Sequence, residues 1–236
     1  MIISGIQKFS TLDFPDYISC IVFIPYCNFR CKYCHNSEFV IPEEIEKIKN
    51  TFIPEKVFFN FLKKRKGKID GVVITGGEPT MQKDLKSFIL KIKKEGFLVK
   101  LDTNGTNPDL IKDLLDRKII DYIAMDVKAP LDKYKEIIDV DIDTDLIKKS
   151  IDIIKVSEVK HEFRTTIEKS LLDYEDIMEI GKLISGCMKY ALQKVKINEN
   201  VLNKNYKFLG SYTDEWFLQV RKMLIDEHYI DDCEIR

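Results

Sequence analysis

The chain has 236 residues, of which 44% are hydrophobic and 33% charged, and its formal net charge at pH 7 is -1. That length allows one large domain with its own core. A net charge so close to zero argues against a general affinity for nucleic acid or for an anionic membrane. No stretch approaches the roughly 18 uninterrupted apolar residues of a membrane span, and the N-terminus lacks the apolar stretch of an export signal. We therefore expect a cytoplasmic protein that binds neither nucleic acid nor membrane.

Short β-branched runs alternate with segments of helical period from residue 18 onward. Six runs predict strands, at residues 18–24, 71–74, 97–101, 119–125, 162–167 and 190–197. Apolar residues three and four apart predict helices between them. These helices begin at Pro54 (with Val57, Phe58, Phe61 and Leu62 on one face), near Leu85, at Pro108 after an Asn107 cap, after an Asp143 cap and at Tyr174. A last helix around 216–224 precedes a short strand near Tyr229.

Strict alternation of strands and helices predicts right-handed parallel βαβ units, and about six of them form either an open doubly wound sheet or most of a barrel. The sequence has no repeat or linker, so we expect one domain. Four polar segments each follow a predicted strand: CNFRCKYC, TGGEP, DTNG and MDVK. In both architectures the C-terminal ends of the strands form the face that carries the active site. We expect the site there.

The stretch CNFRCKYCHN, residues 27–36, places three cysteines within eight residues and a histidine after the last. A reducing cytoplasm disfavours disulfides, so we interpret the cluster as metal ligands. CKYCH fits a haem attachment motif, but that attachment usually happens outside the cytoplasm and leaves Cys27 unexplained. A closed zinc site needs a fourth ligand, and His35 is adjacent to Cys34 instead of a few residues away. The spacing C-x3-C-x2-C favours a [4Fe-4S] cluster with one iron left open.

The other cysteines and the lysine runs have plainer interpretations. Cys20, Cys187 and Cys233 stand alone and are expected to be small buried apolar residues. The runs KKRKGK (63–68) and KIKKEG (91–96) fall at the expected C-terminal turn of a helix just before glycine, where cations complement the helix dipole. We therefore do not interpret either run as a nucleic-acid site.

The motif C-x3-C-x-aromatic-C, here Cys27, Cys31, Tyr33 and Cys34, is followed one βα unit later by GGEP at 76–79. This pair of motifs resembles that of the radical S-adenosylmethionine (radical SAM) enzymes. The resemblance covers nearly the whole chain and extends to the activating proteins of anaerobic ribonucleoside-triphosphate reductase and other glycyl-radical-enzyme activases. The segments that carry it include GIQKFSTLDFP, VVITGGEPTMQ, LDTNG, DVKAP, EFRTTI and the terminal CEIR. Asp16 and Tyr26 depart from it, because relatives commonly have glycine there.

The resemblance implies an α/β fold, a partial (β/α)6 TIM-like barrel with parallel strands, formed by a single radical SAM domain over residues 1–236. It also implies a cluster-binding loop at 25–40 and a C-terminal helix–strand extension at about 205–236. The cofactors would be a [4Fe-4S] cluster, with Cys27, Cys31 and Cys34 as metal ligands, and S-adenosyl-L-methionine.

Nine further residues are candidates for cofactor binding: Tyr33, Gly76, Gly77, Glu78, Asp102, Asn104, Asp126, Lys128 and Arg164. Tyr33 would lie near the adenine, the two glycines would let backbone approach the methionyl ammonium with Glu78 nearby, and Asp102 and Asn104 could bind the ribose or carboxylate region. Asp126 and Lys128 would share a face at the barrel mouth. Arg164, on a buried strand, needs an anionic partner, for which Asp126 and the methionine carboxylate are candidates. Simple turns, packing and ion pairs remain the structural alternatives.

The implied activity is reductive cleavage of S-adenosylmethionine to a 5'-deoxyadenosyl radical, which generates a glycyl radical on a partner enzyme, most specifically anaerobic ribonucleoside-triphosphate reductase. A flavodoxin or ferredoxin would donate the electron. The alternative is a radical enzyme acting on a small molecule, such as 7-carboxy-7-deazaguanine synthase, but a QGEG-like segment and CDT in place of CHN would then be expected. A non-enzymatic zinc or electron-transfer protein is a more remote alternative, and it would not need GGEP.

Overall fold

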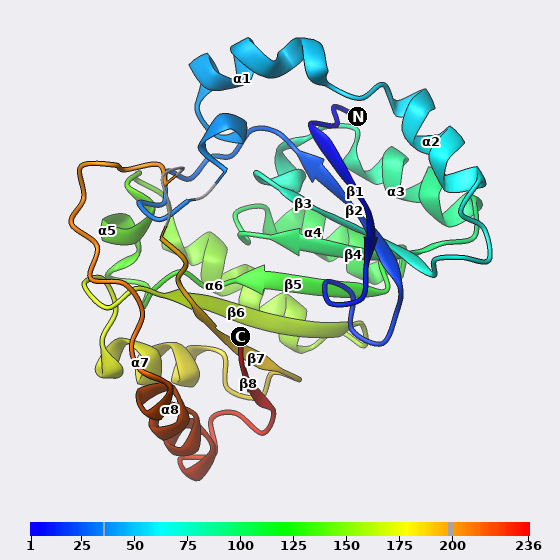
Figure 1. Ribbon diagram of the computed structural model, residues 1–236. Coiled ribbons are helices and arrows are strands. Elements are labelled where there is room, and N and C mark those ends of the chain that lie inside the picture. The colour runs from blue at the N-terminus through cyan, green and yellow to red at the C-terminus, as the bar shows by residue number, and fades with distance from the viewer. Residues whose placement is uncertain (35, 198–200) are drawn as a thin grey trace.

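The computed structural model describes residues 1–34, 36–197 and 201–236. Within these residues, eight strands form one sheet in chain order (Figure 1). The strands are β1 (Gly5–Ser10), β2 (Ser19–Ile24), β3 (Gly71–Gly76), β4 (Leu98–Thr103), β5 (Tyr122–Asp126), β6 (Lys160–Ile167), β7 (Tyr190–Lys194) and β8 (Cys233–Ile235). Strands β2 to β8 run parallel, whereas β1 runs antiparallel to β2. The sheet is therefore an open, partial barrel.

Helices connect the parallel strands, and α3, α4 and α6 lie behind the sheet in Figure 1. The helices are α1 (Pro42–Ile48), α2 (Glu55–Lys63), α3 (Leu85–Lys94), α4 (Pro108–Asp116), α5 (Tyr134–Ile138), α6 (Thr144–Lys155), α7 (Tyr174–Leu183) and α8 (Asp214–Asp226). Two predicted caps are confirmed: the Asn107 side chain accepts a hydrogen bond from Leu110 N, and that of Asp143 accepts one from Asp145 N. Each cap satisfies an amide that the first helical turn leaves free.

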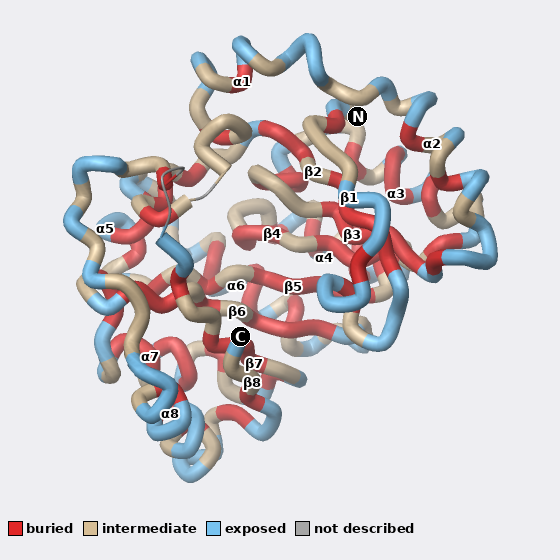
Figure 2. The backbone as a smooth tube through the Cα atoms, viewed as in Figure 1, coloured by how far each residue is buried: buried red, intermediate tan, exposed pale blue. Residues whose placement is uncertain are grey.

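The main core lies between the sheet and the helices, and most residues of the strands and of the helix faces turned toward them are buried (Figure 2). A smaller apolar cluster fills the inner face of the barrel, where Phe14 packs with Ile21, Val73 and Tyr122. A side chain at position 71 would lie 2.7 Å from the Phe14 ring, so Gly71 leaves the room that this ring occupies. Phe14 thus plugs the end of the barrel opposite the C-terminal ends of the parallel strands.

The six predicted parallel strands are confirmed as β2 to β7. The sheet also contains β1, which pairs antiparallel with β2 and lies outside the predicted βα alternation. β1 was not predicted because its middle residues, at positions 7–9, are exposed and leave no apolar alternation. The strand expected near Tyr229 is wrong, since β8 begins only at Cys233. Helices α1 and α5 were also not predicted, and each is only seven residues long or less.

Several details of the helices and loops correct or confirm the sequence interpretation. Helix α2 begins at Glu55, with Pro54 at its N-cap, and on the face predicted for it Phe58 and Leu62 are buried whereas Val57 is 52% exposed. The two lysine runs lie at the C-terminal ends of α2 and α3 as predicted, and Gly96 has the positive φ of a helix stop, 92°. The three isolated cysteines are buried. In the part of the chain that the structure describes, no helix is long and apolar enough to cross a membrane.

Candidate active site

A cavity opens at the C-terminal ends of β2 to β6. All twelve residues selected from the sequence line it: the three clustered cysteines and the nine candidates for cofactor binding. They come from segments up to 137 residues apart (Cys27 to Arg164), brought together because parallel strands present their C-terminal ends at one edge. Phe29, Val40, Thr75 and Thr103 complete the lining. The twelve residues therefore lie together at the edge where the sequence predicts the site, and the role of each residue is a separate question.

The three clustered cysteines lie on the loop that follows β2. All are free thiols, with Cys31 buried and Cys27 and Cys34 half-buried. The loop is shaped by its own backbone: Cys34 N donates to Cys31 O at 2.9 Å, and the Arg30 guanidinium donates to Cys27 O at 2.7 Å. Burial raises the pKa of Cys27 to about 12 and that of Cys31 to about 11. These thiols therefore stay protonated at neutral pH unless a metal replaces the proton.

Two observations bear on what this loop could hold. Among the described residues, no three His, Cys, Asp or Glu side chains converge as one metal ion would require. The Tyr33 hydroxyl, between two of the cysteines, is buried and has no hydrogen-bond partner in the described part of the chain. A buried hydroxyl without a partner is costly, so its position on a cavity wall indicates a polar ligand. His35, the remaining candidate from the zinc and haem interpretations, lies outside the described residues.

Gly76 and Gly77 bring the loop after β3 against the cysteine loop. Gly76 has φ 117°, and a Cβ atom at Gly77 would lie only 2.0 Å from Tyr26 O. The two backbones are joined by hydrogen bonds from Gly77 N to Ile24 O and from Glu78 N to Tyr26 O, both 2.7 Å. Any side chain at Gly77 would force these loops apart, so the contact explains the glycine pair whether or not a cofactor also approaches it.

Glu78 is buried behind this loop, and its side chain links the loop to the end of β4. Its carboxylate accepts hydrogen bonds from Thr80 N at 3.0 Å, Thr103 Oγ1 at 2.8 Å and Asn104 N at 2.6 Å. Burial raises the pKa of Glu78, although these donors oppose the rise. The Asn104 side chain forms the Asx turn that was the alternative interpretation, accepting from Thr106 N at 3.1 Å.

A buried ion network crosses the floor of the cavity on β4, β5 and β6. Arg164 Nε lies 2.7 Å from Asp126 Oδ1, and its Nη1 lies 3.0 Å from Asp102 Oδ2. Lys128 Nζ contacts the other oxygen of Asp126 at 2.9 Å. The expected anionic partner of Arg164 is thus Asp126, with Asp102 as a second. The pairing also confirms that Asp126 and Lys128 share a face.

Lys100 completes this network and was missed by the sequence interpretation. Its Nζ lies 2.6 Å from Asp102 Oδ1, and its side chain is only 2% exposed. The available signal was its position two residues before Asp102 in an otherwise apolar strand, which places both side chains on one face. With Lys128 and Arg164, it gives the network three cations against two carboxylates; Lys100 itself does not line the cavity, whereas the Glu78 carboxylate does.

The network determines the charge state of its members. Burial alone would raise the pKa of Asp126, but Arg164 and Lys128 outweigh it and hold that pKa well below its usual value. Burial would likewise raise the pKa of Asp102, and Arg164 and Lys100 lower it. The same carboxylates keep the pKa of Arg164 and of Lys128 high against the opposing effect of burial. All of these groups are therefore charged at neutral pH.

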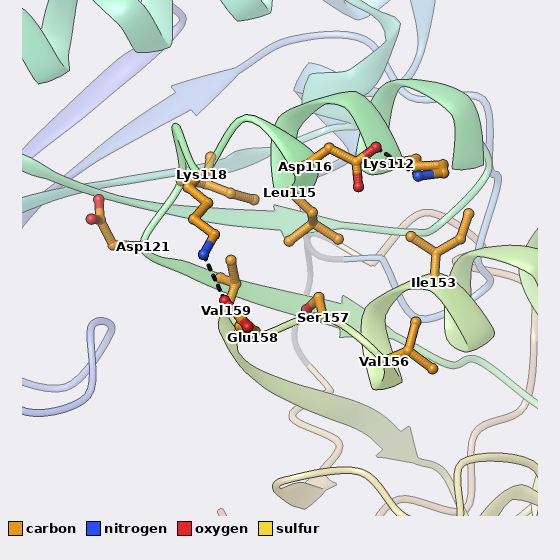
Figure 3. Close-up of a pocket in the computed structure, with 11 residues that line it drawn as sticks. Lys112, Leu115, Asp116, Lys118, Asp121, Ile153, Val156, Ser157, Glu158 and Val159 are labelled. Atoms are coloured by element: carbon orange, nitrogen blue, oxygen red, sulfur yellow. Dashed lines mark hydrogen bonds and ion pairs between the residues drawn. The ribbon is translucent and has the colours of Figure 1, made fainter.

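A larger cavity, of about 590 Å³, lies far from this chemistry, between the ends of α4 and α6 (Figure 3). Its lining charges pair with one another, as Lys118 does with Glu158 at 2.6 Å and Lys112 with Asp116 at 2.6 Å. It lies at the opposite end of the parallel strands from the cysteine loop, and none of the residues predicted for the site lines it. The smaller cavity is therefore the candidate active site.

Comparison with known proteins identifies the family. The family model described as "Radical SAM superfamily" matches residues 21–184. The chain belongs to the radical SAM superfamily. The cofactors of this superfamily are a [4Fe-4S] cluster and S-adenosylmethionine, and they are accordingly the cofactors of this chain.

Individual relatives extend the match over the full length. A protein of Methanocaldococcus jannaschii named "Putative glycyl-radical enzyme activating enzyme" is 38% identical over 242 residues, covering 100% of this chain and 95% of that protein. A second protein of that archaeon with the same descriptive name is 30% identical, covering 85% of this chain and 76% of that protein. The structure of Streptococcus suis SuiB bound to S-adenosylmethionine has a TM-score of 0.66 and 17% identity, covering 92% of this chain and 51% of SuiB. That likeness concerns the fold alone.

The residues around the cavity fit these two cofactors. Iron–sulfur clusters are bound by cysteine thiolates, and this short loop offers three cysteines. Each cysteine would bind a different iron, so the three side chains need not converge on one point. The unpartnered Tyr33 hydroxyl and the lining cations Lys128 and Arg164 suit a polar ligand with a carboxylate. The three cysteines are free thiols, so no disulfide has to be broken before a cluster binds.

Proposed function

We propose that Cys27, Cys31 and Cys34 hold three irons of the [4Fe-4S] cluster and that S-adenosylmethionine binds in the same cavity against its open iron. The convergence of three thiols, the glycine pair and a buried ion network at one edge of the sheet supports this assignment. The chain supplies only three cysteines there, because Cys20, Cys187 and Cys233 are buried elsewhere in the core. A cluster held by these three residues would keep one iron without a protein ligand, and S-adenosylmethionine would supply the ligands there.

The side chains of the cavity bind and orient the cofactor in this proposal. Lys128 and Arg164, the two cations of the lining, attract the methionyl carboxylate, and the buried Tyr33 hydroxyl offers a hydrogen bond on the adenine side. Gly76 and Gly77 carry no side chain, so the backbone of this loop can approach the methionyl ammonium. Asp126 and Lys128 line the same cavity, into which the second substrate must enter to reach the C5' carbon.

We further propose that the chain is an activase that generates a glycyl radical on a partner enzyme. When bound, the cluster and S-adenosylmethionine supply a one-electron cleavage of the C5'–S bond that gives methionine and a 5'-deoxyadenosyl radical. The partner's glycine Cα–H bond then loses its hydrogen atom to C5', which gives 5'-deoxyadenosine. The transfer is downhill because a glycyl radical is delocalised over two flanking amides, whereas the adenosyl radical is a localised primary one.

The names of the two full-length relatives support an activase. The more specific partner that we propose is anaerobic ribonucleoside-triphosphate reductase, on the strength of the segments GIQKFSTLDFP, CNFRCKYCHN and CEIR. A flavodoxin or ferredoxin is the proposed electron donor, since the cluster must work toward the negative end of the Fe–S potential range. We also propose that one domain over residues 1–236 works in the cytoplasm, with the cluster loop at 25–40 and an extension at about 205–236.

Anaerobic reconstitution followed by incubation with S-adenosylmethionine, dithionite and the reductase tests this proposal. The expected result is 5'-deoxyadenosine together with the EPR doublet of a glycyl radical. A reductase in which the substrate glycine is replaced by alanine is the matched control, and it should give no doublet. Formation of 5'-deoxyadenosine without a doublet on the reductase or another glycyl-radical enzyme would refute the activase and favour a small-molecule substrate.

A further inference from the structure

The segment 201–210, which we call the strap, connects the region after β7 to α8 and lies beside the cysteine loop (orange in Figure 1). Its first residues bind the backbone of that loop. Leu202 N donates to Cys34 O at 2.9 Å, and Asn203 N donates to Lys32 O at 3.2 Å. Farther along, the Tyr206 ring lies 4.9 Å from Lys32 Nζ, a cation–π distance. The strap therefore covers the outer side of the loop that carries Cys31 and Cys34.

The far end of the strap is held by the turn just after β6, where Gly210 O accepts from Lys169 N at 2.9 Å and the buried Glu168 carboxylate binds two strap amides. Glu168 is 0% exposed, and its Oε1 accepts from Leu209 N at 2.7 Å and from Gly210 N at 2.8 Å. Its Oε2 accepts from Ser170 N at 2.8 Å and from the Ser170 hydroxyl. In the described part of the chain no cation pairs with Glu168, so amide and hydroxyl donors alone satisfy its charge.

Apolar burial holds the strap only in part, through Tyr206 and Phe208, which pack partly buried against the main core. Of its ten residues only Val201 is buried, and Leu209 is 58% exposed. A segment with few buried apolar contacts opens locally at low cost unless polar contacts hold it. Hydrogen bonds to a charged acceptor are stronger than neutral ones, so the Glu168 end is the firmer of the two attachments.

We propose that Glu168 is a positioning residue that latches the strap over the cysteine loop and so slows the opening of that loop around the cluster. The inference rests on the proposed function in one respect, that the cysteine loop holds the cluster. The latch itself involves only residues of this chain. Glu168 does not contact the cavity, and it acts through Leu209 and Gly210 on contacts made some seven residues earlier at Leu202 and Asn203.

The substitution Glu168→Gln tests the latch with almost no change in volume. The glutamine amide has one oxygen, so its NH₂ group must face two of the donors that the carboxylate accepted. In cluster-free protein, we expect hydrogen exchange at Leu209 and Gly210 to accelerate by at least about tenfold, equivalent to about 1.4 kcal/mol of opening free energy. The decisive amides are Leu202 and Asn203, which should accelerate as well although they do not touch Glu168.

A matched control and a second variant separate the latch from general destabilisation. Glu162→Gln removes another buried carboxylate, on β6 itself, which binds Arg236 Nη2 at 2.7 Å, and should leave strap exchange unchanged relative to the rest of the chain. Lys32→Met removes the cation–π contact from the cysteine-loop side without touching the Ser170 hydroxyl that Tyr206 contacts, and should accelerate Leu202 and Asn203 while Leu209 stays protected. Should Glu168→Gln not fold, the exchange pattern of Lys32→Met decides whether the two ends are separate attachments.

In reconstituted protein, Glu168→Gln should lose its iron–sulfur absorbance to an iron chelator several-fold faster than wild type, and Glu162→Gln should not. The proposal is overturned if Leu202 and Asn203 keep wild-type exchange in Glu168→Gln, or if they accelerate while the chelator rate stays unchanged. A chain that binds no cluster but shows the coupled exchange would refute the cluster assignment and leave the latch intact.

Discussion

Replacing Arg164 with methionine removes the one side chain that joins the two carboxylates of the cavity floor. Arg164 is 12% exposed and makes two charge-assisted hydrogen bonds, to Asp126 at 2.7 Å and to Asp102 at 3.0 Å. Removing one partner of a buried ion pair costs about 3–5 kcal/mol. Lys100 and Lys128 still partner the carboxylates in the variant, so we expect a loss of about 2–4 kcal/mol in the free energy of unfolding at pH 7.

The pH dependence of this loss identifies its origin. Burial raises the pKa of Asp126 in the folded protein, but Arg164 and Lys128 lower it by more, so the net shift is downward. The resulting stability is fully present above the unfolded carboxyl pKa of about 3.9 and is lost as the pH falls below it. The variant has less of this stability to lose. The difference in unfolding free energy between wild type and Arg164→Met should therefore be largest near pH 7 and should narrow as the pH falls from about 5 to 3.

Urea denaturation of cluster-free protein, followed by far-UV circular dichroism at several pH values, measures both quantities without a contribution from cofactor binding. Arg164→Lys is the matched control: it keeps the charge but lacks the planar fork that reaches both carboxylates, so its loss should be intermediate. A loss for Arg164→Met below about 1 kcal/mol, or one that does not change with pH, would refute the ion network described here.

Three further predictions follow from the loops. Gly77→Ala places a methyl group 2.0 Å from Tyr26 O, and it should abolish cluster reconstitution or lower its yield at least about tenfold while the far-UV spectrum stays folded; wild-type iron content would contradict the loop contact. Tyr26 has φ 73°, so Tyr26→Gly should be more stable than Tyr26→Ala by about 1 kcal/mol, seen as a Tm higher by roughly 2–4 °C; equal stabilities would argue against the left-handed backbone. His35→Ala should keep its iron and sulfide, because the sequence assigns His35 no ligand role; loss of the cluster would reopen the zinc and haem interpretations.

The position of the site could be predicted from the sequence because parallel strands have one functional edge. Four polar segments after predicted strands had to meet once the strands were parallel, and they do. What could not be predicted are the partners within that edge. Asp102 pairs with Lys100 and Arg164 together, and Glu78 is enclosed by donors from another loop. Such choices depend on three-dimensional distances that no local pattern encodes.

The edges of the fold were harder to predict than its centre. The central strands are buried on both faces and therefore read as continuous apolar runs, as in IVFI and GVVI. β1 pairs on one side only and exposes three of its six residues, so its sequence resembles a loop. Asp16 and Tyr26 occupy the two positions where glycine was expected, and both have the left-handed backbone that favours glycine, with φ values of 69° and 73°. The sequence shows that Asp16 and Tyr26 replace glycine, whereas only the structure shows that the left-handed backbone is kept.

The most direct test of the central claim is the iron, sulfide and zinc content of anaerobically reconstituted protein, measured together with S-adenosylmethionine cleavage. The account predicts about four irons and four sulfides per chain, 5'-deoxyadenosine on addition of dithionite, and loss of both in a Cys31→Ser variant, while Cys187→Ser retains them. Stoichiometric zinc without an iron–sulfur chromophore, or a cluster that survives in Cys31→Ser, would contradict it.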